Sequence, residues 1–308
     1  MTRIGIMQGR LLPPVDNRIQ CFPREHWAKE FELAAQADLD CIEWIYDLYG
    51  ADVNPLSTDE GMEQMKSLSR RYNVQVLSVC ADYFMDRPLV RASASEMAER
   101  LAILEWLLGR GHLLGINRMV LPFVDASRID TDPEFDSVCA TLTRILPTAE
   151  KNNIEIHLET SLTPGRFAEL LARLPHPMLK ANYDSGNSSS LGYSPRDEFT
   201  AYGSRVGSVH IKDRVLGGST VPLGTGDADF QALAESLNTI RYAGDFILQV
   251  AREIPGNEVA WAKQNRDFVW KHFNCLSSRR LLSWASWLAT RRSHDMSLER
   301  KRFKPAGG

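Results

Sequence analysis

Short apolar runs recur along the first 250 residues of the chain, and longer segments with helical periodicity separate them. The runs are rich in Ile, Val and Leu and have the length of β-strands. They lie at about residues 3–7, 41–45, 74–80, 118–122, 154–159, 179–184, 207–212 and 246–250. Because every gap between them can hold a crossover helix, the pattern predicts parallel strands that alternate with helices.

The segments between the runs predict amphipathic helices. Trp27, Phe31 and Ala34 recur at spacings of four and three residues, which places them on one helix face. Ser95 before EMAERL and Asp229 before FQALAESL are residue types that favour a helix N-cap or first turn. Eight βα units within roughly 250 residues match a closed (β/α)8 TIM barrel, so we predict an α/β fold of this type. An open doubly wound sheet is the alternative, but no GxGxxG follows the first strand.

The pattern changes near the end of the chain. We predict a barrel domain over residues 1–273, followed by a C-terminal helical extension and a mobile basic tail over residues 274–308. Within RRLLSWASWLATRR, Leu281, Trp284 and Leu288 fall on one helix face. This helix is expected to pack on the barrel or on another subunit, with a helix lying on a membrane surface as the alternative.

Composition limits the classes of function. A chain of 308 residues with 44% hydrophobic residues can bury a large core, and a formal net charge of -3 offers no overall field for nucleic acid or an anionic membrane. The five cysteines show no CxxC spacing, which favours reduced thiols over a disulfide framework. The first residues lack a long apolar core and no run is long enough to span a membrane, so we expect a cytoplasmic protein.

Strand alternation predicts which side chains point into the barrel. In IEIHLE the isoleucines and the leucine should face the helices, which turns Glu155, His157 and Glu159 inward. The same parity turns Asn182 and Ser208 inward on the next two strands. The carboxyl ends of barrel strands form the rim where active sites lie. Each of the last four strands carries a polar side chain near this end: Glu159, Asp184, His210 and Gln249.

These four side chains predict a metal site. Unpaired carboxylates inside a barrel destabilise it by roughly several kcal/mol each, and one divalent cation would neutralise them together. Oxygen and imidazole ligands without a thiolate suit Mn, Mg, Co or Zn and do not select one of them. A structural alternative pairs Glu159 with Lys180 or Lys212 and leaves His210 as a core histidine. Four such residues at the ends of consecutive strands favour the functional interpretation.

The strings IGIMQGRL, CIEWIYD, HLETSL, NYDSGN, SVHIKDR and VPLGTGDADF occur in this order between residues 3 and 273. In these strings the chain resembles the xylose isomerase-like TIM barrel superfamily. That superfamily includes sugar phosphate isomerases and epimerases, inosose dehydratase and endonuclease IV of AP endonuclease family 2. The resemblance implies one divalent metal ion and a small carbohydrate substrate. In the family's sugar epimerases a Glu, an Asp, a His and a second Glu bind the metal, and the two glutamates exchange protons with the substrate.

Two positions depart from that pattern. By resemblance, Glu159, Asp184 and His210 occupy the first three ligand positions, but Gln249 stands at the fourth. An amide oxygen can bind a cation, whereas Gln cannot accept a proton at neutral pH. Asn187 stands where the epimerases commonly have a histidine. The scheme with two glutamates is therefore not available unchanged.

The implied reaction begins with Glu159, which removes a carbon-bound proton beside a carbonyl while the cation offsets the charge of the enediolate. Lys212 is the preferred group to return the proton, with Glu43, Asp82 and Glu159 itself as alternatives. The candidates for substrate binding at the rim are Gln8, Arg10, Glu43, Asp82, Asn187, Arg214 and Arg252. The Gly-rich loop KDRVLGGSTVPLGTGDADF could bind a phosphate at its backbone amides, or its glycines could serve only the turn.

The leading interpretation is a divalent-metal-dependent isomerase or epimerase of a sugar or sugar phosphate. An inosose-type dehydratase would use the same site, and Gln249 keeps open a sugar-binding barrel that has lost catalysis. An endonuclease IV-like nuclease is disfavoured, because several zinc ions need more ligands and only His157 and His210 point inward among the histidines. We expect no nucleic-acid or membrane partner, and assembly into a homo-oligomer stays open.

Overall fold

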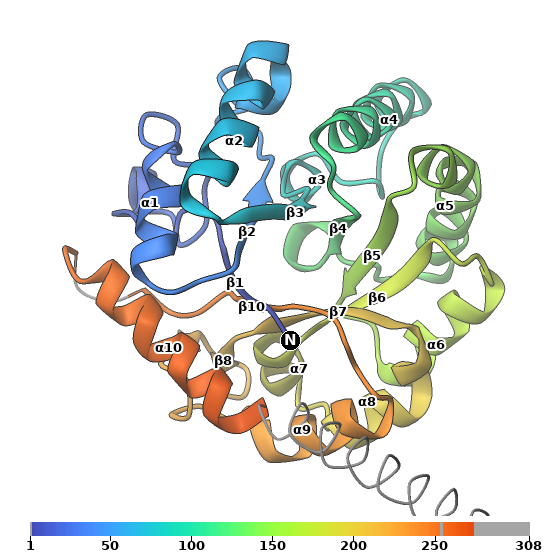
Figure 1. Ribbon diagram of the computed structural model, residues 1–308. Coiled ribbons are helices and arrows are strands. Elements are labelled where there is room, and N and C mark those ends of the chain that lie inside the picture. The colour runs from blue at the N-terminus through green and yellow to red at the C-terminus, as the bar shows by residue number, and fades with distance from the viewer. Residues whose placement is uncertain (1, 253–254, 274–308) are drawn as a thin grey trace, which may run out of the picture.

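Residues 2–252 and 255–273 are described by a computed structural model (Figure 1). Eight of the strands form a closed barrel in the order β1-β10-β7-β6-β5-β4-β3-β2, and neighbouring strands run parallel. These strands are β1 (Ile4–Met7), β2 (Cys41–Ile45), β3 (Gln75–Cys80), β4 (Arg118–Phe123), β5 (Glu155–Thr160), β6 (Leu179–Asp184), β7 (Val206–Ile211) and β10 (Phe246–Leu248). Each predicted strand is present, so the predicted (β/α)8 barrel is confirmed.

Most of the helices surround the barrel and cover its outer face, and two short ones directly follow the carboxyl ends of β3 and β6 (Figure 1). They are α1 (Lys29–Gln36), α2 (Asp59–Tyr72), α3 (Tyr83–Asp86), α4 (Ala94–Leu114), α5 (Asp132–Asn152), α6 (Pro164–Arg173), α7 (Ser185–Leu191), α8 (Pro195–Tyr202), α9 (Phe230–Thr239) and α10 (Glu258–Phe273). An antiparallel hairpin of β8 (Asp213–Arg214) and β9 (Thr220–Val221) follows β7. In Figure 1, α10 (orange) lies beside α1 (blue), which closes the ring of helices.

Local sequence explains where the helices begin. Asp229 caps α9 as predicted, because its Oδ1 accepts a hydrogen bond of 2.8 Å from the backbone N–H of Ala232. Ser95, predicted as a cap or first-turn residue, lies in the first turn of α4, which begins at Ala94 and has Ser93 as its N-cap. Only Ser93 has a glutamate three positions later, and this Glu96 completes a capping box that Ser95 cannot form.

The predicted C-terminal extension over residues 274–308, with its apolar helix face, lies outside the described residues, and the boundary at residue 273 stays a prediction. Within the part of the chain that the structure describes, no helix is both long and apolar enough to cross a membrane. The cysteines in this part are free thiols, as predicted: Cys21, Cys41, Cys80 and Cys139.

Glu30 on α1 forms a hydrogen bond with the loop after β1. Its carboxyl group is buried, and Oε1 accepts a hydrogen bond of 2.6 Å from the backbone N–H of Gly9. Gly9 has a φ of +81°, and a Cβ there would lie 2.7 Å from the carbonyl oxygen of Cys21, so the loop requires glycine. Burial raises the pKa of Glu30 to about 8, against the opposing effect of the hydrogen bond from Gly9. The loop that carries Arg10 is therefore held by an acid that is mostly protonated at neutral pH.

Glu30→Gln is expected to remove a pH-dependent loss of stability. The pKa of Glu30 in the folded protein is about 8, whereas an unfolded glutamate titrates at roughly 4.3. The raised pKa contributes stability that is present below the unfolded value and is lost as the pH rises through the folded value. We expect similar free energies of unfolding for both proteins at pH 5, and a wild-type deficit on the order of 4 kcal/mol at pH 9. Denaturant unfolding between these values measures the difference, and parallel pH profiles would contradict the prediction.

Candidate functional site

Glu159, Asp184 and His210 lie together at the carboxyl ends of β5, β6 and β7. One ligand atom from each can be chosen so that all three atoms lie within 4.8 Å of one another. His210 Nδ1 is 3.3 Å from Glu159 Oε2 and 3.9 Å from Asp184 Oδ2. All three side chains are buried. The fold therefore brings together three of the residues that the sequence predicted as metal ligands.

Asp184 is held in one orientation because it both ends β6 and caps α7. Its Oδ1 accepts hydrogen bonds from the backbone N–H groups of Gly186 at 2.9 Å and Asn187 at 2.8 Å. Its Oδ2 accepts no hydrogen bond of good geometry, although the Nζ of Lys212 forms an ion pair with it at 2.8 Å. The cap occupies one carboxylate oxygen, and the other faces the positive charge of Lys212.

Two asparagines hold the carboxylate of Glu159. The Nδ2 of Asn187 donates to Oε1 at 2.5 Å, and the Nδ2 of Asn182 donates to Oε2 at 3.2 Å. The amide oxygen of Asn182 accepts a hydrogen bond of 2.6 Å from the hydroxyl of Ser208 on β7. This bond turns the NH2 group of Asn182 toward Glu159, so the carboxylate is fixed from two neighbouring elements.

Glu43 orients His210 from inside the barrel. The Nε2 of His210 donates to Glu43 Oε1 at 2.6 Å, and Ser78 Oγ donates to Glu43 Oε2 at 2.6 Å. Burial alone would raise the pKa of Glu43. The charge and the hydrogen bond of His210, with smaller contributions from Arg118 and Ser78, together outweigh burial and lower this pKa to about 2. Burial alone would lower the pKa of His210, whereas the charges and hydrogen bonds of Glu43 and Glu159 together raise it to about 10. Because Nε2 is bound to Glu43, Nδ1 is the ring nitrogen that faces Glu159 and Asp184.

Glu43→Gln is expected to weaken the binding of a divalent ion at His210 by about 10- to 100-fold, as is typical for partners that orient a ligand histidine. The amide keeps the shape of the side chain and removes its negative charge. Titration calorimetry with Mn²⁺ measures the affinity. Glu155→Gln is a matched control, because Glu155 contacts His157 at the other end of β5. An unchanged affinity for Glu43→Gln, or an equal loss in the control, would refute the prediction.

Lys212 follows β7 and reaches the ligand cluster. Its Nζ lies 2.8 Å from Asp184 Oδ2 and donates to Asn187 Oδ1 at 3.3 Å. Arg214 donates to the same oxygen of Asn187 at 3.1 Å. A Cβ at Gly186 would lie 2.6 Å from the Cγ of Lys212. The missing side chain at position 186 is what leaves room for Lys212 beside Asp184.

Gln249, the predicted fourth ligand, follows β10. Its Nε2 donates to Gln20 Oε1 at 2.9 Å, and its own Oε1 is buried without a partner. β10 pairs with β7 so that Ile247 lies opposite His210, which places position 249 at the same rim. A buried carbonyl oxygen without a hydrogen bond fits a site that takes a cation. The chain thus offers oxygen atoms from three residues and one imidazole nitrogen.

A cavity of about 470 Å³ contains the exposed part of this site. Its size is typical of cavities that bind small molecules. Seven of the residues predicted from the sequence line it: Arg10, Asp82, Glu159, Asn187, Lys212, Arg214 and Gln249. Burial raises the pKa of Asp82 to about 6, against the hydrogen bond that Gln20 donates to it.

Five other predicted residues are not among the lining residues of this cavity: Asp184 and His210 of the ligand cluster, and Gln8, Glu43 and Arg252. Gln8 is buried, and its Oε1 accepts a hydrogen bond of 2.9 Å from the backbone N–H of Ile45. Arg252 donates three hydrogen bonds to backbone carbonyl groups of the loop after β1. Both oxygens of Glu43 are bound inside the barrel. The positions of Gln8, Glu43 and Arg252 favour a structural role beneath and beside the rim over the predicted contact with the substrate.

The Gly-rich loop after β7 uses its amides internally. The buried carboxylate of Asp213 accepts hydrogen bonds from the backbone N–H groups of Gly224 at 2.8 Å, Gly226 at 3.0 Å and Ala228 at 3.1 Å. Amides that are bound to Asp213 are not free for a phosphate. The contacts therefore support the alternative in which the glycines serve the turn.

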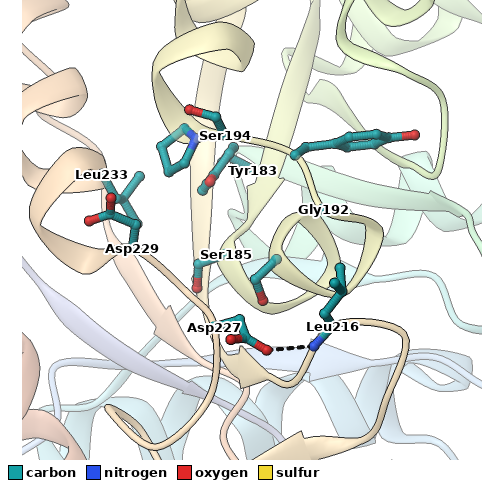
Figure 2. A pocket seen from close by; sticks show the side chains of 11 residues that line it. Tyr183, Ser185, Gly192, Ser194, Leu216, Asp227, Asp229 and Leu233 are labelled. Carbon is teal, nitrogen blue, oxygen red and sulfur yellow. Dashed lines mark hydrogen bonds between the residues drawn. The ribbon is translucent and has the colours of Figure 1, made fainter.

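Figure 2 shows a second cavity of about 300 Å³, where Tyr183, Ser194 and Leu216 are among the lining residues. Its two carboxylates are engaged with the backbone. Asp227 accepts a hydrogen bond of 2.6 Å from the N–H of Leu216, and Asp229 caps α9. None of the three clustered ligand residues is among its lining residues, whereas Glu159 lines the larger cavity. We therefore place the candidate site in the larger cavity.

No role was predicted from the sequence for two polar residues of the site, Asn182 and Gln20. Asn182 was predicted to point inward, but strand parity does not show that its amide binds Glu159. Gln20 lies in the loop between β1 and α1, where no periodic pattern indicates direction. The only sequence signal for Gln20 is its place after a strand that ends at the rim.

The closed barrel and its polar cluster define a (β/α)8 protein with a site at the carboxyl ends of the strands. A family model described as xylose isomerase-like TIM barrel matches residues 31–271. The chain belongs to this family, and the resemblance inferred from the sequence strings is confirmed. A comparison with curated proteins finds no match.

Solved structures share the fold at low sequence identity. An L-ribulose 3-epimerase is 18% identical with a TM-score of 0.71, and the match covers 92% of this chain and 98% of that chain. A xylose isomerase domain protein from Planctomyces limnophilus is 19% identical with a TM-score of 0.69, over 90% and 98%. The IOLI protein, solved with a zinc atom, is 17% identical with a TM-score of 0.70, over 88% and 99%. At these identities the similarity shows the fold alone.

Proposed function

We propose that the protein is a divalent-metal-dependent isomerase or epimerase of a sugar or sugar phosphate. One observation carries the proposal: Glu159, Asp184 and His210 place ligand atoms within 4.8 Å of one another, and Glu159 lines a cavity that is also lined by Gln249, whose Oε1 has no partner. The family supports it, and so does the fold shared with an L-ribulose 3-epimerase and with a protein that binds zinc.

The proposed metal ligands are Glu159, Asp184, His210 and Gln249. A divalent ion bound there would supply Lewis-acid chemistry toward the oxygens of a carbonyl substrate. Mn, Mg, Co and Zn all suit this donor set. Arg10, Asp82, Asn187 and Arg214 line the same cavity and offer hydrogen bonds to the substrate's hydroxyl or phosphate oxygens.

Glu159 is the proposed base. Its two oxygens are fixed by asparagine amides, and it lines the cavity. It would take the proton from the carbon beside the carbonyl, and the electron pair left behind forms an enediolate. Lys212 lines the same cavity and is the proposed acid that returns a proton to carbon. Gln249 cannot take this second role, because an amide neither accepts nor supplies a proton at neutral pH.

Two alternatives keep the same site. Loss of a β-hydroxyl after proton removal would make the protein an inosose-type dehydratase. The neutral Gln249 favours a third outcome, a barrel that binds a sugar without turning it over. An isomerase or epimerase, a dehydratase and a sugar-binding protein would bind related ligands. They would differ in the product that they release.

The test is metal analysis of the purified protein, followed by incubation with ketoses, inososes and their phosphates in D₂O. Each substrate is offered with Mn²⁺, Mg²⁺, Co²⁺ or Zn²⁺. An isomerase or epimerase that transfers protons gives an isomeric product with deuterium at the reacting carbon. Loss of water indicates the dehydratase, and saturable binding without turnover indicates the binding protein. Turnover without deuterium uptake would contradict proton transfer with solvent exchange and favour a hydride shift.

A further inference from the structure

Gln20 joins three polar side chains of the cavity through its amide group. Its Oε1 accepts hydrogen bonds from Gln249 Nε2 at 2.9 Å and from Arg10 Nη2 at 3.2 Å. Its Nε2 donates to Asp82 Oδ2 at 2.7 Å. All four residues line the cavity that Glu159 also lines. Gln20 is therefore the hydrogen-bonding centre of this side of the site.

The partners of Gln20 fix the direction of its amide. Arg10 can only donate, and an ionised Asp82 can only accept. A reversed amide would set the NH2 group of Gln20 against the guanidinium group and its oxygen against the carboxylate. Both partners are themselves held, since Arg10 Nε donates to Val250 O at 3.1 Å and Cys80 Sγ donates to Asp82 Oδ1 at 3.0 Å. The oxygen of Gln20 is thus directed toward position 249.

This fixed oxygen requires a hydrogen-bond donor at position 249. Gln249 meets the requirement with its NH2 group, and its own Oε1 is left without a partner. A carboxylate at position 249 would set oxygen against oxygen across a contact that is now a hydrogen bond of 2.9 Å. The amide at this position is therefore not interchangeable with a carboxylate while Gln20 is present.

We propose that Gln20 is a positioning residue that orients Gln249, so that the amide oxygen of Gln249 serves as the cation ligand and a carboxylate at this position is disfavoured. The inference rests on the proposed function, because it takes the cation site as given. Gln20 and Gln249 then act as a pair of amides. Gln249 lacks the negative charge of a glutamate, and Gln20 holds its neutral amide oxygen in a fixed orientation.

A double-mutant cycle on the full-length protein tests this pairing, with Mn²⁺ as the probe and titration calorimetry without substrate as the readout. The four proteins are the wild type, Gln20→Leu, Gln249→Glu and the double variant. In the wild-type background, Gln20→Leu is expected to weaken Mn²⁺ binding by about tenfold, because the amide of Gln249 loses its orientation. In the Gln249→Glu background, the same change is expected to strengthen binding by about tenfold, because it removes the oxygen that opposes the carboxylate.

The reversal of sign is the result that a merely structural role of Gln20 would not produce. Weaker binding in both backgrounds would overturn the inference, as would a gain of at least about tenfold from Gln249→Glu alone. Failure of all four proteins to bind Mn²⁺ would overturn the cation site, and with it both the proposed function and this inference. A sign reversal in a protein without turnover would leave the inference standing and remove the proposed activity.

Two further variants keep the cycle interpretable. Gln36→Leu makes the same change at an exposed position of α1 and is expected to leave Mn²⁺ binding unchanged. Circular dichroism and unfolding temperatures report whether each protein folds. Gln20→Asn shortens the side chain while keeping its polarity, and it is expected to show the same two signs as Gln20→Leu. If Gln20→Leu does not fold, opposite signs with Gln20→Asn support the inference and equal signs overturn it.

Discussion

Glu159→Gln is expected to lower turnover by roughly 10²- to 10⁴-fold, the range over which a positioned general base acts. The amide has nearly the same shape as the carboxylate but cannot take a proton at neutral pH. The glutamine oxygen can still accept from one of Asn182 and Asn187, and only the other hydrogen bond is lost, so the barrel should remain folded. Steady-state kinetics on the substrate found in the D₂O panel measures the effect, and circular dichroism measures the fold.

Metal content separates the two roles proposed for Glu159. Loss of the base removes turnover even in protein that still holds its metal, whereas loss of a ligand removes both together. Glu155→Gln changes the first residue of the same strand, at the opposite end of the barrel, and should leave turnover unchanged. A Glu159→Gln variant with wild-type activity would end the assignment of this residue as the base.

Lys212→Met is expected to reduce product formation by at least roughly 10²-fold while deuterium exchange into the substrate continues. The variant keeps Glu159 and therefore keeps proton removal, but it lacks the ammonium group that returns a proton. The two rates are measured together by NMR in D₂O. Met fits the space beside Gly186, because its stem is similar to that of Lys and a Cβ at position 186 is absent.

Lys212 also forms an ion pair with Asp184, and the rate of deuterium exchange distinguishes an orienting role of this pair from acid catalysis. Loss of both exchange and product formation would assign Lys212 to orientation of the site instead of acid catalysis. Lys180→Met is the matched control, because Lys180 lies near the amino end of β6, away from the ligand cluster. Its turnover should equal that of the wild type.

The barrel could be predicted from the sequence because its strands are apolar runs of the correct length, separated by helices with clear periodicity. The position of the ligand cluster followed from strand parity. Glu159, Asp184 and His210 each lie at the end of a run, and parallel strands in a closed barrel bring such ends to one rim. These features depend on patterns within one element, which the sequence shows directly.

Depth within the barrel and contacts between loops could not be predicted in the same way. Glu43 was predicted to contact the substrate at the rim, but a register shift between Ile42 and Glu43 sets its height relative to the neighbouring strand. Glu43 therefore binds His210 below the cavity. Gln20 meets Gln249 across 229 positions of sequence, from a loop without periodicity. Such contacts depend on the assembled fold and have no local signal.

The pairing of β1 with β10 has a consequence for synthesis of the chain. β1 receives one neighbour early, from β2, but its other edge is covered only by residues 246–248. At a translation rate of about 5 to 20 residues per second, this edge stays open for roughly 10 to 50 seconds. During that interval the nascent chain presents an unpaired strand that another chain could join. The ribosome-bound protein therefore keeps an exposed strand edge until its last strand emerges.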